Sequence, residues 1–297
     1  MPNNDGTCLP YTVLTFSVGC GTGRSEIAAS LAYLLATRGY RVWLVDGNLF
    51  APSLDLLLGF RDGTDTLCQY LAGSQAMVPA YDIPVPVENG ESGGLLLTPA
   101  SRDETVRRQV EEVLQDSDWL AERLPEGIMQ RAAMSTVDVI VVDSVPDLTP
   151  INRVWLAMSS LLLVVSGPNS VDSELLRTVF LEDGVRDVTR KLVLFNNLEL
   201  DDAHTPRGAM APGLYEKRVA DLIRSHTTGM IFGQDVEVFP APVPFSSSLA
   251  TFDHRDGLFV QHHPSSSFSR RMIRLSELVE VGLRDPSPHS VEEGKTG

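Results

Sequence analysis

The sequence has little positive charge and few lysines. Lys and Arg together number 24 against 39 Asp and Glu in 297 residues, which gives a formal net charge of −15, and no lysine precedes Lys191. Non-specific DNA binding needs a stripe of basic side chains that follows the phosphate backbone. The composition therefore predicts that nucleic acid is not a direct partner.

Cysteines are also few, and long apolar runs are missing. Cys8, Cys20 and Cys68 are odd in number and lack CxxC spacing, which disfavours a disulfide framework, an iron–sulfur scaffold and a structural zinc site. The apolar run 161–165 has the length of a strand, too short to cross a bilayer, and the N-terminus does not resemble a secretion signal. We expect a soluble, cytoplasmic protein.

A glycine-rich turn lies between a predicted strand and a predicted helix near the N-terminus. Residues 11–16 are β-rich, the segment Ser-Val-Gly-Cys-Gly-Thr-Gly-Arg-Ser follows at 17–25, and 26–38 has helical apolar spacing that ends at Gly39. A second strand of the buried type, 41–45, ends at Asp46. These elements predict a β-α-β unit with a right-handed crossover.

The rest of the chain continues the alternation of strands and helices. Apolar runs without alternation are typical of parallel strands covered on both faces. Strands are predicted at 94–98, 137–142, 161–165 and 192–195, and a last strand and turn at 237–244. Helices are predicted at 64–72, 104–131 (interrupted near Pro125 and Gly127), 173–181, 214–225 and 268–283. We predict one domain over 11–284, a flexible N-terminus over 1–10 and a disordered tail over 285–297.

The glycine-rich turn is suited to binding an anion, because backbone N–H groups converge at a helix N-terminus where the macrodipole adds favourable potential. The standard phosphate loop is G-x-x-x-x-G-K-[ST], and the corresponding frame here runs from Val18 to Ser25 with Arg24 in the lysine position. A glycine turn without a ligand is the alternative. Asp46 and Asp143 end two predicted strands, and open α/β sheets bind ligands at that edge.

The chain resembles the MinD/ParA family of deviant Walker-A ATPases, which belong to the SIMIBI class. The resemblance implies a three-layer α/β P-loop NTPase fold with a mostly parallel central sheet and helices on both faces. It extends in order along 11–284. Similar segments are the loop and helix at 15–32, the second strand at 39–48, its continuation at 52–59, the Walker-B strand at 137–146, a base-side strand at 192–197 and a late loop at 243–246.

The resemblance also implies ATP or ADP with Mg²⁺ as cofactor. The nucleotide contacts that it implies are Gly19, Cys20, Gly21, Thr22, Gly23, Arg24, Ser25 and Glu26 for the phosphates and Asn196 and Pro244 for the base, and the implied Mg²⁺ ligands are Ser25, Asp46 and Asp143.

Three positions depart from the family pattern. Arg24 replaces the phosphate-binding lysine, and Gly19 replaces the signature lysine that reaches across a nucleotide-sandwich dimer. Asn48 stands at the position of the water-orienting acid. Arginine still forms bidentate pairs with oxyanions, but phosphoryl transfer depends on these positioned charges. We predict that nucleotide binding persists while hydrolysis is weak or lost.

The function that the resemblance implies is the positioning or assembly of a cellular machine through protein contacts, by a homodimer with protein partners. One alternative is an active ATPase that cycles between monomer and nucleotide-sandwich dimer; another is a metallochaperone-type NTPase, for which paired Cys or His ligands are missing. Cys20 is more readily explained as a tolerated turn residue than as a redox switch. The helix 268–283 is more readily explained as a core-packing helix than as a membrane-surface element. His262 and His263 are expected on the surface.

Overall fold

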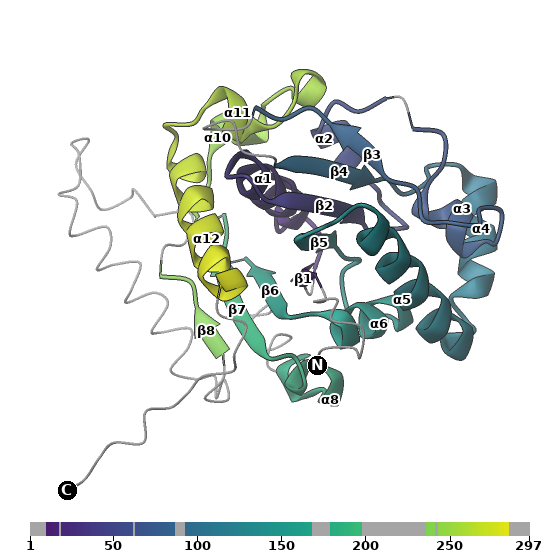
Figure 1. Cartoon of the computed structure of the whole chain (residues 1–297). Coiled ribbons are helices and arrows are strands. Elements are labelled where there is room, and N and C mark those ends of the chain that lie inside the picture. Colours follow the sequence, from purple (N-terminus) through teal and green to yellow (C-terminus); the bar gives the residue numbers. More distant parts are fainter. Residues whose placement is uncertain are drawn as a thin grey trace, which may run out of the picture.

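The computed structural model describes residues 10–17, 19–61, 63–86, 93–167, 179–197, 236–240 and 243–284 (Figure 1). Its strands form one eight-stranded sheet in the order β3-β4-β2-β5-β1-β6-β7-β8, and among the described pairs β3 with β4 is the antiparallel one. The strands are β1 (Tyr11–Phe16), β2 (Arg41–Asp46), β3 (Tyr81–Ile83), β4 (Gly94–Thr98), β5 (Val139–Asp143), β6 (Leu161–Ser166), β7 (Arg190–Phe195) and β8 (Val236–Val238).

Helices cover both faces of the sheet (Figure 1). On one face α1 (Arg24–Thr37) and α12 (Ser267–Arg284) pack against strand residues such as Val13. On the other face α5 (Ser117–Met134) and α6 (Pro150–Met158) pack against the alternate strand residues. Successive side chains of a strand point to opposite faces, so two hydrophobic clusters arise from one set of apolar strands. The predicted three-layer, mostly parallel α/β fold is confirmed.

Shorter helices connect these layers, and several fall close to the predicted ranges. They are α2 (Leu54–Leu57), α3 (Leu67–Leu71), α4 (Glu104–Val113), α8 (Asp183–Arg186), α10 (Ser247–Ala250), the 3₁₀ helix η3 (His254–Asp256) and α11 (Phe259–His262). The predicted helix 214–225, most of the predicted helix 173–181, residues 1–9 of the N-terminus and the tail 285–297 lie outside the described residues. Within the described ranges, no helix combines the length and apolar character needed to span a bilayer.

The predicted break of the helical region 104–131 near Pro125 is wrong. The break lies between α4 and α5, where the Asp116 carboxylate accepts a hydrogen bond from the Trp119 N–H at 3.0 Å and caps α5. α5 then continues through Pro125, because its buried residues Leu120 and Ile128 hold both halves against the sheet. Tertiary packing outweighs the local cost of proline.

Gly127 is a packing residue of α5 and not a helix breaker. A Cβ atom at this position would lie 2.1 Å from the hydroxyl oxygen of Tyr70. That hydroxyl donates a hydrogen bond to the Arg123 carbonyl at 2.9 Å. Glycine therefore lets α3 approach α5 closely.

The C-terminal helix α12 belongs to the core. Phe268, Met272 and Leu275 on its apolar face are at most 1 % exposed and pack in the cluster with α1. At the end of α1, Arg38 pairs with Glu280 at 2.8 Å. The face that a membrane-surface helix would present is covered by protein.

Candidate functional site

The carboxyl ends of three central strands meet beside the glycine-rich loop. Asp46 at the end of β2 is the register partner of Asp143 at the end of β5, and Thr15 of β1 is the register partner of Asp143 on its other side. A cavity of about 520 Å³ opens at this edge, within the size range of small-molecule sites. Its lining comprises Gly19, Cys20, Gly21, Thr22, Gly23, Arg24, Ser25, Glu26, Asn48, Phe50, Ala51, Ser53, Leu57, Val145, Pro146 and Thr149.

The loop reaches helix α1 through a left-handed glycine. Gly23 has φ 78°, and a Cβ atom there would lie 2.3 Å from Asn196 Nδ2. The same amide nitrogen donates to the Thr22 carbonyl at 2.7 Å, so the end of β7 holds the loop in place. Pro244 is near this strand end, since the Val243 N–H donates to the Phe195 carbonyl at 2.8 Å. Asn196 thus lies beside the loop, Pro244 follows the residue that is bonded to the end of β7, and neither is part of the cavity lining.

Arg24, the first residue of α1, folds back onto the Walker-B strand. Its Nε donates to Asp143 Oδ1 at 2.7 Å, and its Nη1 donates to Ser17 Oγ at 2.9 Å. The Arg24 side chain is 7 % exposed and that of Asp143 is fully buried. Arg24 therefore forms a buried ion pair at the site where the family lysine would face phosphate.

Asp46 accepts hydrogen bonds from backbone N–H groups of the segment that follows β2. Its Oδ2 accepts from the Ser53 and Leu54 N–H groups at 3.1 and 3.2 Å, and its Oδ1 accepts from the Asn48 N–H at 3.2 Å. Burial, and secondly the neighbouring Asp143 carboxylate, raise the pKa of Asp46 well above its usual range, against the effect of the three N–H donors. The side chain fixes the start of α2 to the end of β2.

Asn48 lies at the cavity wall. Its Nδ2 donates to the Ala51 carbonyl at 2.9 Å. Its Oδ1 is buried and has no hydrogen-bond partner within the described part of the chain. An amide oxygen accepts hydrogen bonds but removes no proton at neutral pH, so Asn48 can position a ligand donor without acting as a base.

Glu26 lies in the first turn of α1 and also lines the cavity. Burial raises the pKa of Glu26 to about 7, with a smaller opposing effect of the hydrogen bond from Ser30. Its Oε2 lies 3.6 Å from His254 Nε2. Burial also lowers the pKa of His254. Both shifts favour the neutral forms, so this contact is weaker at neutral pH than a pair of two full charges.

The carboxylates of this site do not fit a Mg²⁺ ion in the present arrangement. Mg²⁺ requires oxygen ligands in near-ideal octahedral geometry. Both oxygens of Asp46 accept backbone N–H groups, and Oδ1 of Asp143 accepts from Arg24. Of the oxygens of these two strand-end carboxylates, Asp143 Oδ2 is therefore the one without a hydrogen-bond partner among the described residues. No group of three or more His, Cys, Asp or Glu side chains in the described ranges is arranged to hold a metal.

Two serines at the site were not predicted. Ser17 is fully buried, accepts from Arg24 and donates to the Gly19 carbonyl at 2.9 Å. Ser53 supplies one of the N–H groups that Asp46 binds. Ser17 directly follows β1, and Ser53 lies in the segment between β2 and α2. Both lie at the carboxyl edge of the sheet, and that position is the signal in the sequence that could have identified them.

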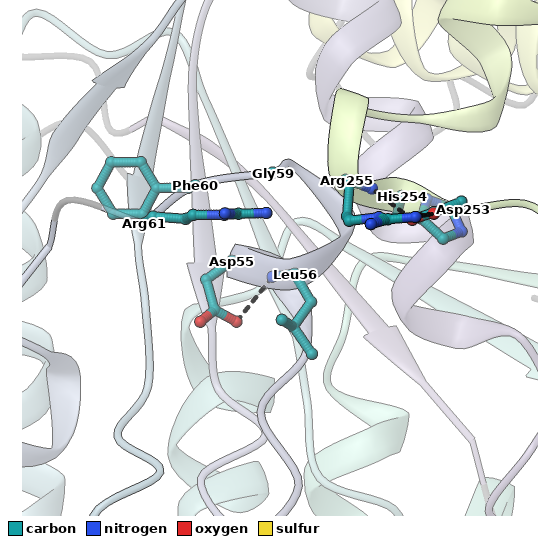
Figure 2. A pocket seen from close by; sticks show the side chains of 8 residues that line it. All are labelled: Asp55, Leu56, Gly59, Phe60, Arg61, Asp253, His254 and Arg255. Atoms are coloured by element: carbon teal, nitrogen blue, oxygen red, sulfur yellow. Dashed lines mark hydrogen bonds and ion pairs between the residues drawn. The ribbon is translucent and has the colours of Figure 1, made fainter.

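A second, smaller cavity of about 180 Å³ lies between the segments 55–61 and 253–255 (Figure 2). Asp253 pairs with Arg255 beside it, and Asp55 pairs with Arg102. Figure 2 shows the apolar side chains of Leu56 and Phe60 among those that line it. The volume is below that of ordinary small-molecule sites, and the carboxylates have arginine partners, so the larger cavity is the candidate functional site.

The fold and the glycine-rich loop resemble those of P-loop NTPases of the SIMIBI class. No family model matches the chain. Among curated proteins it is similar to the flagellum site-determining protein YlxH of Helicobacter pylori, with 26% identity over 149 residues that cover 50% of this chain and 45% of the relative. The chain spans about half the length of the curated relatives it matches.

Solved structures give the same result over nearly the whole chain. The septum site-determining protein MinD complexed with Mg-ADP from Pyrococcus horikoshii has a TM-score of 0.65 and 19% identity, and the match covers 92% of this chain and 96% of that chain. The MinC:MinD cell division protein complex of Aquifex aeolicus has a TM-score of 0.66 and 18% identity, with coverage of 91% and 96%. Other solved structures with this fold are a cell division ATPase MinD from Pyrococcus furiosus and a ParA family ATPase from Chlorobium tepidum, and the predicted resemblance to the MinD/ParA family is confirmed.

Proposed function

We propose that this chain is a MinD/ParA-like protein that positions or assembles a cellular machine through protein contacts. It binds ATP or ADP at the glycine-rich loop and hydrolyses ATP slowly or not at all. The relatives named as site-determining proteins support the positioning role. The loss of hydrolysis rests on the chain's own residues.

The observation that carries this proposal is the ion pair of Arg24 with Asp143 at 2.7 Å. In P-loop NTPases the loop lysine neutralises phosphoryl charge and an acid of the Walker-B strand holds the metal. Here the cation of the loop and the acid of the strand bind each other. Arg24 is the basic side chain of the described cavity wall, and it is paired with Asp143. Asn48 stands at the position of the water-orienting acid and carries no carboxylate.

Protein partners and a homodimer belong to the same proposal. The Aquifex aeolicus structure is a MinC:MinD complex, which supports partners for a chain of this fold. Gly19 has no side chain to reach across a dimer. A dimer of this chain is therefore held by its remaining surface, where Phe50 at the cavity mouth is 41% exposed.

Localisation in living cells tests the positioning role. The full chain is fused to a fluorescent protein and expressed at its native level, and the same cells are examined after deletion of the gene. We expect the fusion protein to form fixed foci. In the deletion strain we expect the machine that it positions to be displaced or missing. The control is Arg108→Ala, which removes an exposed pair with Glu104 at 3.2 Å and should leave the foci unchanged. Uniform fluorescence and unchanged cells would refute the proposal.

An active ATPase is the second candidate, because a cavity of about 520 Å³ is large enough for a nucleotide. In that case Arg24 leaves Asp143 when nucleotide binds and takes the role of the lysine. Steady turnover that Asp143→Ala abolishes would favour this candidate. Equal turnover in the wild-type chain and in Asp143→Ala would eliminate it.

A further inference from the structure

The phosphate-loop site already contains a cation that belongs to the chain. Asp143 is fully buried at the end of β5. A buried carboxylate needs a compensating charge and hydrogen bonds, because transfer out of water costs several kcal/mol. The guanidinium of Arg24 supplies both, through Nε at 2.7 Å from Oδ1.

Arg24 is fixed at a second point. Its Nη1 donates to Ser17 Oγ at 2.9 Å, and Ser17 in turn donates to the Gly19 carbonyl at 2.9 Å. The guanidinium is planar, and its rigid donors lose little freedom when two acceptors are already in place. The loop, the first helix and the Walker-B strand are thus joined through one side chain.

A divalent cation at Asp143 competes with this arrangement. An ion about 2.0–2.1 Å from a carboxylate oxygen of Asp143 would lie close to the positive guanidinium, and the two cations repel in a medium of low dielectric constant. Asp46, the other strand-end acid, offers no free oxygen, because its two oxygens accept three backbone N–H groups.

We propose that Arg24 is the resident cation of this site and takes the place of a divalent metal at Asp143. The inference concerns the site of the proposed function and rests on that assignment. It predicts that the wild-type chain has no divalent-cation site at Asp143 and that removal of the guanidinium creates one. The nucleotide-free chain thereby keeps its loop bound to the Walker-B strand without Mg²⁺.

The test is direct binding of Mn²⁺, followed by loss of the electron paramagnetic resonance signal of the free ion. Mn²⁺ prefers the same oxygen ligands as Mg²⁺. The proteins are wild type, Arg24→Ala, Asp143→Asn and the double variant, all as full chains without nucleotide. Because the net charge of −15 attracts divalent cations weakly over the whole surface, the double variant supplies the background.

We expect Arg24→Ala to bind Mn²⁺ at least about tenfold more tightly than wild type, and the added Asp143→Asn to remove that gain. Asp143→Asn in the wild-type background should leave Mn²⁺ binding unchanged. A wild-type site lost in Asp143→Asn, or no gain in Arg24→Ala, would overturn the proposal. If Arg24→Ala does not fold, Arg24→Gln serves for the same comparison. Cellular localisation is independent of this readout, so either idea can fail alone.

Discussion

The buried pair of Arg24 and Asp143 should dominate the stability of the loop region, and a double-mutant cycle tests this. Arg24→Met removes the guanidinium with little change in side-chain length, and Asp143→Asn removes the carboxylate charge. Each single change leaves one buried charge without its partner, because the two side chains are 7 % and 0 % exposed. Such changes cost about 3–5 kcal/mol of the free energy of unfolding.

The double variant should lose much less than the sum of the single losses. With both charges gone, neither partner remains buried and unpaired, and we expect a coupling energy of about 2–3 kcal/mol. Urea unfolding followed by the fluorescence of the buried Trp43 and Trp155 measures all four free energies. The exposed pair of Arg108 with Glu104 is the control, with an expected coupling of about 0.5 kcal/mol or less. Losses at Arg24 and Asp143 that add within about 0.5 kcal/mol would refute the reasoning.

Three further results are expected. Burial raises the pKa of Glu26 from 4.5 to about 7, so the folded chain keeps the Glu26 proton to a higher pH than the unfolded chain does. The free energy of unfolding should therefore fall as the pH rises between these values. The fall should be about 3 kcal/mol at most and absent in Glu26→Gln, as pH-dependent urea unfolding would show. Gly23→Ala should cost at least about 1 kcal/mol in the same unfolding measurement, because φ is 78° and the methyl would meet Asn196; equal stability would contradict this. In a Cys8→Ser background, thiol reagents should modify exposed Cys20 quickly and native Cys68 hardly at all, since burial raises the pKa of Cys68 to about 11.

Much of the fold could be predicted because the central strands are continuous apolar runs, two of which end in an aspartate, Asp46 and Asp143. β5 and β6 are fully buried along their length, and the strands predicted at 94–98, 137–142 and 161–165 lie within two residues of β4, β5 and β6. The error at Pro125 has a different origin. Proline breaks helices locally, but the packing of the buried residues Leu120 and Ile128 keeps α5 continuous, and this packing cannot be read from the local sequence.

The site could be predicted only as a set of positions. Spacing brought Asp46, Asp143 and the loop to one edge of the sheet, and they meet there. The sequence could not indicate that Arg24 bonds to Asp143, because one side chain can bind either a ligand phosphate or an internal carboxylate. It also could not indicate that backbone N–H groups occupy the Asp46 oxygens, since that depends on how the chain turns before α2.

The central claim is that the chain holds nucleotide and hydrolyses it slowly or not at all, and a single-turnover measurement tests it most directly. Excess protein is mixed with a trace of labelled ATP and Mg²⁺, protein-bound label is collected over time, and its conversion to ADP is measured. The account predicts that the label stays on the protein as ATP. Rapid conversion to ADP that Asp143→Asn abolishes, or failure of the label to remain with the protein, would contradict it.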